Sequence, residues 1–378
     1  MHEVAKKAKI TLFISFSGEG GVERMISNLI HEFVRQGHPV DLLLIKARGE
    51  HLKQLPPEVN IIKLGSDHSA LTLWPLIRYM RKHKPKCMLV AKHRAIVIAV
   101  LARALAGVET RIIGRLGTNL SRALEGKNAL RKWLWHAPMR KIYPKVDLII
   151  PVSEGVLDDI ASITHLDHSK LRVIRNPVIT PQMYQLADQP VEHPWFSEGE
   201  PPVILGAGRF TRQKDFITLI KAFAKVRQQQ ACRLVLLGYG ALQTEYEALA
   251  TELGVAEDIS MPGFTSNPYA YMKRADLFVL SSAWEGSPNV LSEALAQGTP
   301  VVATDCPSGP REVLRGGKVA PLTPVGDVEA MAKAMIETIN NPPPSKSLQD
   351  AVSEYTAQKS AQHYLEALGI DAVQSVVE

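Results

Sequence analysis

The sequence predicts an α/β protein built from two doubly wound, parallel-sheet domains. Short apolar runs suited to buried strands alternate with helical patterns in the first half, and a second series of the same kind starts near residue 203. Buried apolar strands that alternate with helices form parallel sheets with helices on both faces. The length of 378 residues also suits two domains of ordinary size.

The first domain is expected over residues 1–178. Its strands are expected at residues 10–16, 40–45, 60–64, 87–91, 111–115 and 147–152. Residues 22–36 carry apolar side chains at helical spacing, and Gly37 is suited to end that helix. A further helix is expected at residues 96–105.

The alternation lapses over residues 179–202, where proline, polar and acidic side chains dominate, and we expect an interdomain linker there. The second domain is expected over residues 203–345. Its elements are predicted as strands at 203–208, 233–238, 259–261, 277–281 and 301–304, with helices at 215–228, 242–253, 267–274, 288–297 and 328–340. Residues 346–378 are expected to form a helical tail that packs back on the first domain.

The cysteine content and the apolar runs bound the class of protein. Cys87, Cys232 and Cys306 are far apart and odd in number, so a reducing compartment is expected rather than a disulfide framework. No run of 18 apolar residues is present in the sequence, so no segment is predicted to span a membrane.

Residues 78–145 are strongly basic, with 17 Lys and Arg against two acids. A stretch of this kind favours an anionic partner. Within it, Trp133, Trp135 and Tyr143 stand among cations, a mixture typical of the bilayer interface. No zinc-finger or RNP signature accompanies it, so we expect an anionic membrane surface and no nucleic acid. The alternative is a solvated basic face whose tryptophans pack inward.

The sharpest motif is WEGSPNVLSEA, in which Glu285 and Glu293 bracket a turn from a strand into a helix. Gly286 permits close backbone approach, Ser287 suits the N-cap, and Pro288 suits the first helical position. The N–H groups at such a helix start can hold an anion or sugar oxygens. Glu293 can accept both hydroxyls of a ribose. The alternative is an ordinary capped helix with two surface acids.

Two further loops follow strands. After the first strand of the second domain, Arg209 and Lys214 can clamp a diphosphate, although they could equally be solvated cations. After the first strand of the chain, Gly20 and Gly21 lie in a loop that is only loosely like a dinucleotide fingerprint. No acidic residue follows the next strand at the position that NAD binding would use.

Together these pieces resemble glycosyltransferase family four, a retaining family with members in bacterial polysaccharide and lipopolysaccharide biosynthesis. The resemblance covers nearly the whole chain and is most specific over residues 203–327. The matching positions are Gly20–Gly21 with Glu23 and Arg24, Gly208–Arg209 with Lys214, residues 237–240, residues 262–264, and Glu285 with Glu293. The resemblance implies the GT-B architecture, two Rossmann-like domains facing a deep cleft, with the acceptor bound by the first domain and the donor by the second.

The resemblance also implies a role for each matching residue. Arg209 and Lys214 neutralise the donor diphosphate, Glu285 contacts the donor sugar, and His93 is the match to the family's cleft histidine. Glu293 holds the ribose. The other implied donor contacts are Gly20, Gly21, Gly238, Gly263, Phe264, Gly286, Ser287, Pro288, Asn289 and Val290. Two positions depart from the family pattern: Ser287 replaces a larger apolar residue, and Tyr239 stands where an acid is frequent, so the donor sugar and the base contacts stay open.

No D-x-D or H-E-x-x-H motif occurs, and we expect no metal and no cofactor besides the nucleotide-sugar donor, with UDP favoured over GDP. The acceptor implied by the resemblance is a lipid-linked or lipopolysaccharide glycan at the inner face of the cytoplasmic membrane. Front-face displacement with retention is likewise implied. The alternatives are a nucleotide-sugar epimerase or NAD-dependent dehydrogenase on the same architecture, and a non-catalytic binder of anionic surfaces. The oligomeric state is left open.

Overall fold

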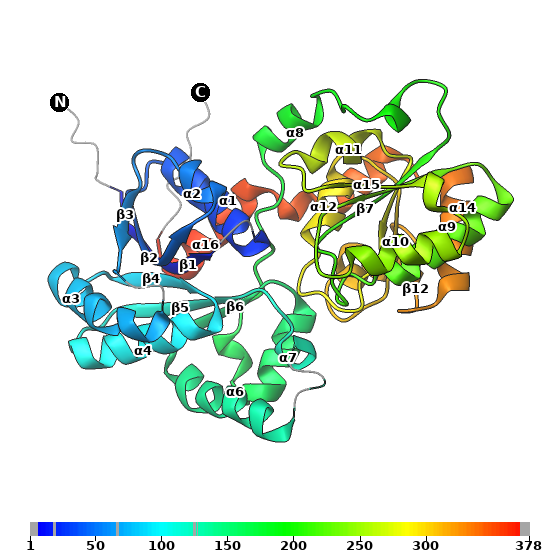
Figure 1. Ribbon diagram of the computed structural model, residues 1–378. Coiled ribbons are helices and arrows are strands. Elements are labelled where there is room, and N and C mark those ends of the chain that lie inside the picture. Colours follow the sequence, from blue (N-terminus) through cyan, green and yellow to red (C-terminus); the bar gives the residue numbers. More distant parts are fainter. Residues whose placement is uncertain (1–6, 18–19, 66–67, 124–125, 127, 371–378) are drawn as a thin grey trace, which may run out of the picture. The chain divides into compact units, whose positions relative to one another are not determined.

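The computed structural model describes residues 7–17, 20–65, 68–123, 126 and 128–370 (Figure 1). The chain divides into two compact units. Unit 1 comprises residues 1–177 and 357–378, and unit 2 comprises residues 178–356. Each unit contains one six-stranded sheet whose described pairings are all parallel.

The sheet of unit 1 has the strand order β3-β2-β1-β4-β5-β6. Its strands are β1 (Ile10–Ser17), β2 (Val40–Arg48), β3 (Asn60–Lys63), β4 (Cys87–Ala91), β5 (Arg111–Leu116) and β6 (Leu148–Pro151). The chain builds outward from β1 in one direction and from β4 in the other. The point between β1 and β4 is therefore the topological switch point, outside which ligands of open α/β sheets bind.

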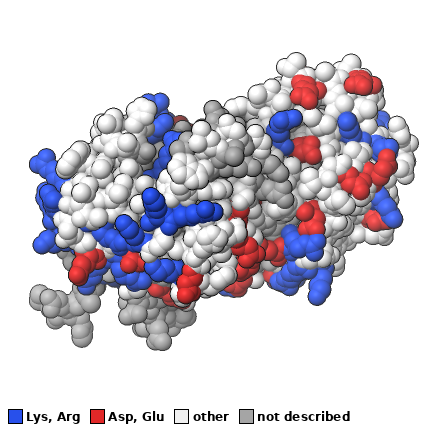
Figure 2. Space-filling view, turned by 90° about the horizontal axis from the view of Figure 1, so that it is seen from below, with Lys and Arg blue, Asp and Glu red and all other residues white. Residues whose placement is uncertain are grey.

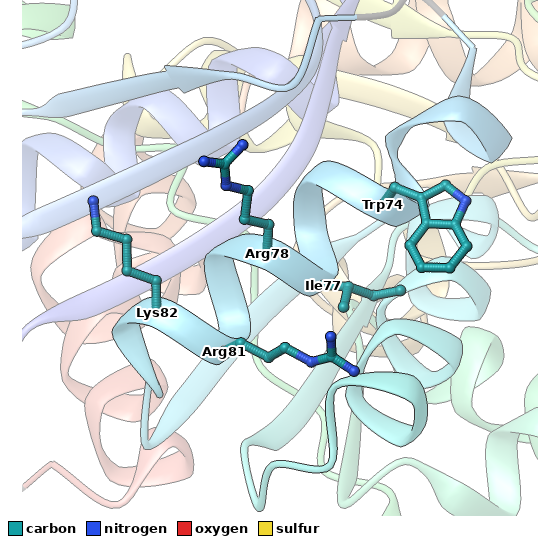
Figure 3. Close-up of a pocket in the computed structure, with 5 residues that line it drawn as sticks. All are labelled: Trp74, Ile77, Arg78, Arg81 and Lys82. Carbon is teal, nitrogen blue, oxygen red and sulfur yellow. The ribbon is translucent and has the colours of Figure 1, made fainter.

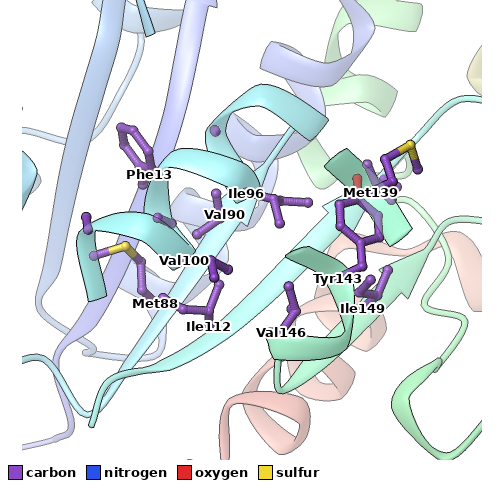
Figure 4. Close-up of a cluster of buried hydrophobic side chains, with 14 of the residues drawn as sticks. Phe13, Met88, Val90, Ile96, Val100, Ile112, Met139, Tyr143, Val146 and Ile149 are labelled. Atoms are coloured by element: carbon purple, nitrogen blue, oxygen red, sulfur yellow. The ribbon is translucent and has the colours of Figure 1, made fainter. Parts of the chain in front are cut away.

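Helices cover both faces of this sheet (Figure 1). They are α1 (Gly21–Arg35), α2 (Glu50–Lys53), α3 (Leu73–His83), α4 (His93–Ala106), α5 (Leu120–Ala123), α6 (Ala129–Ile142), α7 (Glu154–Thr164) and α16 (Ala357–Leu368). Because strand side chains alternate between faces, Phe13 of β1 packs with α3 and α4, whereas Leu12 and Ile14 pack with α1 and α16. Figure 4 shows the first of these two apolar clusters, where Tyr143 and Met139 pack near β6.

The sheet of unit 2 has the order β12-β11-β10-β7-β8-β9, which is the same topology taken from the opposite edge. Its strands are β7 (Val203–Ala207), β8 (Arg233–Leu237), β9 (Ile259–Gly263), β10 (Leu277–Leu280), β11 (Val301–Thr304) and β12 (Leu322–Thr323). Its helices are α8 (Pro181–Ala187), α9 (Phe216–Gln229), α10 (Gln243–Glu252), α11 (Pro268–Arg274), α12 (Asn289–Ala296), α13 (Pro310–Val313), α14 (Val328–Asn340) and α15 (Ser345–Ala351). The predicted pair of doubly wound parallel sheets is confirmed.

The unit boundaries differ from those expected from the sequence. Residues 179–202, expected as a linker, belong to unit 2, where α8 packs on α11 and Asn267 Nδ2 donates to Leu186 O at 2.8 Å. The expected tail is divided, because α15 packs on α12 in unit 2 whereas α16 packs on α1 in unit 1. The sequence indicated a linker for the first segment and a single helical tail for the second, but packing contacts with distant parts of the chain place residues 179–202 and α15 in unit 2.

The sequence pattern also missed the helices α3, α6, α7 and α8. A local signal was present for α7, since Ser153 caps it by accepting a hydrogen bond from Val156 N at 3.2 Å. Helix α6 contains Pro138 and has no regular apolar stripe. Its inward face is set by contacts with α4 and α7 rather than by its own periodicity.

The loops at the carboxyl edge of the unit 2 sheet approach one another closely. Gly208 N donates to Leu237 O, and Gly238 N donates to Gly263 O, both at 2.9 Å. A β-carbon on Gly238 would lie 1.9 Å from Gly208 O, and the φ of Gly238 is +141°. Only glycine allows this backbone contact, so Gly238 is required for the ends of β7, β8 and β9 to pack together.

We expect Gly238→Ala to lower the free energy of unfolding by at least about 2 kcal/mol more than Gly254→Ala does. Gly254 also has positive φ, at +70°, but no atom lies within 4 Å of the place its β-carbon would occupy. Its substitution costs only the backbone strain, about 1 kcal/mol. Chemical denaturation of both variants measures the difference, and equal losses would show that the close approach is not a constraint.

Candidate active site

An ion pair between a partly buried lysine and a buried glutamate crosses the switch point of unit 2. Lys214, in the loop after β7, lies 2.7 Å through Nζ from Oε1 of Glu285, in the loop after β10. Ser282 Oγ donates to the same carboxylate oxygen at 2.7 Å. Gly208 makes room for the lysine stem, because a β-carbon there would lie 2.8 Å from Lys214 Cε. The structure thus brings the predicted cation and the predicted acid together at the carboxyl edge of the sheet.

The loop after β11 closes over Glu285. Glu285 N donates to Pro307 O at 2.8 Å, and Ser308 N donates to Glu285 O at 3.2 Å. Burial, together with the Glu285 carboxylate, raises the pKa of the neighbouring Cys306 thiol to about 12. Cys306 therefore stays protonated at neutral pH and adds no charge beside Lys214 and Glu285.

Helix α12 begins one residue later than the motif indicated. Pro288 occupies the N-cap and Asn289 the first helical position, so the expected N-cap role of Ser287 and helical role of Pro288 are wrong. The N-cap residue Pro288 makes no side-chain hydrogen bond to this end of the helix. Glu293 is 0% exposed and Glu285 is also buried, which excludes the alternative of two surface acids. Carboxylates are rarely buried without a specific reason.

The other donor-contact positions predicted in unit 2 lie at strand ends. Arg209 follows β7 and is exposed, Gly263 is the last residue of β9, and the exposed Phe264 comes directly after it. Phe264 and Tyr239 are 54% and 58% exposed, and their ring centroids are 6.3 Å apart at an angle of 81°. The sequence marked Tyr239 only as a departure from the family pattern, whereas the structure places it as half of an exposed aromatic pair.

A second ion pair crosses the switch point of unit 1, and the sequence analysis missed it. Lys92, directly after β4, lies 2.8 Å through Nζ from Glu23 Oε1 in α1, and it also donates to Ser15 O at 2.9 Å. Lys92 has a φ of +77°, a strained value for a residue with a β-carbon. The two contacts hold the lysine in this conformation. The sequence pattern carried no signal for it beyond its position at a strand end.

The Lys92–Glu23 pair lies beside the predicted site residues of unit 1. Gly20 is the N-cap of α1 and Gly21 its first residue, and a β-carbon on Gly20 would lie 2.5 Å from Glu23 Oε2. His93 follows Lys92 and opens α4. Residues 18 and 19 of the glycine loop lie outside the described residues.

His93 is largely enclosed by aromatic side chains. Its Nδ1 lies 2.9 Å from the Tyr143 hydroxyl, and its ring centroid is 5.4 Å from that of Trp135. Burial, with a smaller contribution from the charge of Arg94, lowers the pKa of His93 to about 4. Burial raises the pKa of Tyr143. His93 is therefore neutral, and Tyr143 protonated, at neutral pH.

Two parallel sheets of this topology, each with its polar residues at the carboxyl edge, are the architecture of GT-B glycosyltransferases. The chain superposes on HepE of Anabaena, solved with UDP and glucose, with a TM-score of 0.75 at 20% identity over 96% of this chain and 99% of that one. It superposes on the lipopolysaccharide outer core galactosyltransferase WaaB with a TM-score of 0.72 at 19% identity over 95% and 99%.

Sequence comparison identifies the family. The family model described as Glycosyltransferase Family 4 matches residues 19–181, and that described as Glycosyl transferases group 1 matches residues 191–359. The chain belongs to glycosyltransferase family 4, as its motifs indicated, and it is a glycosyltransferase.

Curated relatives match over most of their length. One is the N-acetylgalactosamine-N,N'-diacetylbacillosaminyl-diphospho-undecaprenol 4-alpha-N-acetylgalactosaminyltransferase of Campylobacter jejuni, 29% identical over 87% of this chain and 90% of that protein. Another is the lipopolysaccharide core biosynthesis glycosyltransferase LpsE of Rhizobium meliloti, 26% identical over 88% of each.

We expect the stability of the protein to fall between pH 6.5 and pH 4 in part because of His93. Its pKa is lowered on folding, so the unfolded chain binds a proton in this window that the folded chain does not, and stability rises with pH. His93→Gln removes this dependence, so the variant loses less free energy of unfolding between pH 6.5 and pH 4 than the unaltered protein does, by on the order of 3 kcal/mol. Urea denaturation at the two pH values measures it.

Tyr143→Phe is the matched control for this prediction. It removes the hydroxyl that contacts His93 but keeps the burial that lowers the pKa, so most of the pH dependence remains. If His93→Gln and the unaltered protein lose stability in parallel on acidification, the claim that folding lowers the pKa of His93 is contradicted.

Proposed function

We propose that the protein is a retaining, metal-independent transferase that moves a hexose or N-acetylhexosamine from a UDP-sugar to a membrane-anchored glycan. The observation that carries the proposal is the contact between Lys214 and the buried Glu285 at the switch point of unit 2. The names of the Campylobacter jejuni and Rhizobium meliloti relatives, an undecaprenol-linked glycan transferase and a lipopolysaccharide core biosynthesis transferase, support this class of acceptor.

In this proposal the donor diphosphate binds at the carboxyl edge of the unit 2 sheet. Lys214 and the exposed Arg209 lie in the same loop after β7, where they can face phosphate oxygens. Glu285 fixes the position of the lysine ammonium and presents its other oxygen to sugar hydroxyls. The negative charge on the leaving nucleoside diphosphate grows as the glycosidic bond breaks, so fixed cations stabilise the transition state more than the ground state. This assigns to two side chains the charge neutralisation that a divalent metal supplies in other transferases.

The nucleoside is assigned to the neighbouring strand ends. Glu293 accepts the ribose hydroxyls, and the exposed rings of Tyr239 and Phe264 flank the base. Glu293 has no exposed surface in this structure, so its contact with ribose requires local displacement of the groups that cover it. Aromatic faces suit stacking against a pyrimidine, and the preference for UDP over GDP then depends on backbone groups near Gly263.

In unit 1, we assign His93 to a donor-sugar hydroxyl. When the Tyr143 hydroxyl donates to Nδ1, the proton of the neutral imidazole is on Nε2, which can then donate to the sugar. No residue is assigned as a nucleophile. Retention follows from front-face displacement, in which the leaving phosphate oxygen takes the proton of the acceptor hydroxyl as the new bond forms.

Calorimetric titration of the protein with UDP, GDP and NAD tests the donor site. We expect UDP to bind, and Lys214→Ala to weaken binding by at least about 10-fold because a charge-assisted contact to phosphate is lost. Lys333→Ala is the control, since that lysine is exposed on α14. A transfer assay with the UDP-sugar then compares the anomeric configuration of donor and product, with and without EDTA.

The outcomes separate the parts of the proposal. Binding of NAD without any nucleoside diphosphate contradicts the transferase donor site and favours a dehydrogenase or epimerase. An inverted product, or activity abolished by EDTA and restored by Mg²⁺, would overturn the retaining or the metal-independent assignment while leaving the donor site intact.

The membrane proposal rests on α3 more than on the stretch that the sequence favoured. Tyr143 is fully buried with its hydroxyl against His93, so the expectation that it reaches a bilayer is wrong. Trp135 is partly buried and lies against His93. Trp74 of α3 is 72% exposed, and Trp133 is exposed as well. No helix in the described part of the chain is long and apolar enough to cross a bilayer.

Helix α3 combines an exposed ring with cations. Trp74, Arg78 and Lys82 follow one another at four-residue spacing along the helix, beside a shallow groove of about 560 Å³ that Ile77 and Arg81 also line (Figure 3). Figure 2 shows several Lys and Arg side chains close together on its left side, which belongs to unit 1. Rings and long cations of this kind suit the interface of an anionic leaflet. We therefore propose that α3 docks on the inner face of the cytoplasmic membrane.

Flotation with vesicles of phosphatidylcholine, with and without 30 mol% phosphatidylglycerol at roughly the charge of an anionic leaflet, tests this surface. We expect Arg78→Gln/Lys82→Gln to weaken binding to the anionic vesicles roughly 30-fold, at about 1 kcal/mol per cation. Trp74→Ala is expected to weaken binding further. The control, Lys318→Gln/Lys333→Gln, makes the same charge change on exposed residues of unit 2. If the two double variants weaken binding equally, net charge alone explains the attraction to the vesicles, and a docking face on α3 is contradicted.

A further inference from the structure

Unit 1 buries a guanidinium without a carboxylate partner. Arg115, in β5, is 2% exposed, and its Nη2 donates to the neutral Oδ1 of Asn176 at 2.5 Å. The fully buried Tyr364 hydroxyl is also near it, since the charge of Arg115 opposes the rise that burial causes in the pKa of that tyrosine. Among the residues that the structure describes, no carboxylate pairs with Arg115. Buried charges are otherwise paired, because an unpaired one is costly to desolvate.

The guanidinium borders a cavity of about 290 Å³ at the carboxyl edge of the unit 1 sheet. A β-carbon on Gly117 would lie 3.2 Å from Arg115 Nη1, which places the charged group beside this lining residue. The cavity is lined by Val22, Lys92, His93, Arg115, Leu116, Gly117, Thr118, Leu120 and Trp135. Two of these nine residues are cations, none is an acid, and Trp135 adds an aromatic wall.

The acids that touch the cavity wall are already engaged. Glu23 pairs with Lys92, and the Oδ2 of Asp159 accepts hydrogen bonds from Leu120 N at 2.6 Å and Ser121 N at 3.2 Å. Neither neutralises Arg115. The cavity therefore has a net positive lining, and an anion entering it gains a partner that the folded chain does not supply.

We propose that this cavity is a subsite for an anionic group, a phosphate or a carboxylate, carried by the acceptor glycan, with Arg115 as its buried cation. A guanidinium matches either group through two parallel hydrogen bonds. The volume accommodates the anion and part of an adjoining sugar ring, for which Trp135 provides an apolar wall. The assignment to an acceptor rests on the proposed transferase function, whereas the affinity for an anion rests only on the cavity.

Thr118→Glu and Thr118→Gln test the missing counter-charge without removing a buried residue. Thr118 lines the cavity and is exposed, so both variants are expected to fold. The new glutamate supplies the carboxylate that Arg115 lacks. It therefore raises the thermal midpoint above that of the glutamine variant and competes with any added anion. Identical midpoints and identical anion binding in the two variants would overturn the proposal.

Binding is measured by calorimetry with inorganic diphosphate and, separately, with glucuronate, in the presence of saturating UDP. We expect saturable binding of at least one probe to the unaltered protein, weakened at least about 10-fold by Arg115→Gln and by Thr118→Glu but unaffected by Arg94→Gln. The tighter probe identifies the anionic group. No saturable binding, or equal binding by all variants, overturns the subsite, and displacement of the probe by UDP assigns the cavity to the donor instead.

The result for UDP binding and the result for anion binding are independent of each other. UDP binding without anion binding leaves the proposed function standing and removes the subsite. Anion binding without UDP binding leaves an anion site whose assignment to a glycan acceptor fails together with the proposed function.

Discussion

Each sheet of this protein is held at its switch point by a lysine that reaches across to a carboxylate. In unit 2, the lysine follows the central strand β7 and the acid follows β10. In unit 1 the polarity is reversed, because Glu23 follows β1 and Lys92 follows β4. The two strands that meet at each switch point are not consecutive in the chain, so no short backbone connection joins their loops. In each pair the carboxylate is buried and the lysine is partly exposed, so loss of the lysine would leave a buried carboxylate without its partner, and the pair can therefore hold the two loops together.

The ion pairs explain why glycines precede them. A β-carbon on Gly208 would meet the stem of Lys214, and one on Gly20 would meet the carboxylate of Glu23. In both units, glycine lets a charged side chain lie against the backbone at the strand end. The loop that holds Gly20 and Gly21 is weak as a dinucleotide fingerprint, and the structure gives it a different reason to contain glycine.

Elements of the fold could be predicted from the sequence where their signal lies in neighbouring residues. The strands β4 and β11 and the helix α14 were predicted with the observed bounds, since their apolar patterns depend only on neighbouring residues. The Lys214–Glu285 pair joins residues 71 apart, yet both were found because each lies at a recognisable strand end. Lys92 was overlooked because its positive φ and its contact with Glu23 exist only in the folded chain. Tyr143 was misplaced for the same reason, since its amphipathic ring suits a bilayer until His93 supplies a buried partner for its hydroxyl.

The partly buried Lys214 and the buried Arg115 differ in a way that matters under the proposed function. Lys214 already has a carboxylate partner, so a donor diphosphate must share it with Glu285, and the net gain is modest until the leaving phosphate gains charge. Such a cation favours the transition state over the bound donor. The side chain of Arg115 has a neutral hydrogen-bond partner and no carboxylate among the described residues, so an anion of constant charge would stabilise it, which favours tight holding of a group that does not react. Under the proposed function, the carboxylate partner of Lys214 suits it to the chemical step, and the neutral partner of Arg115 suits it to positioning the acceptor.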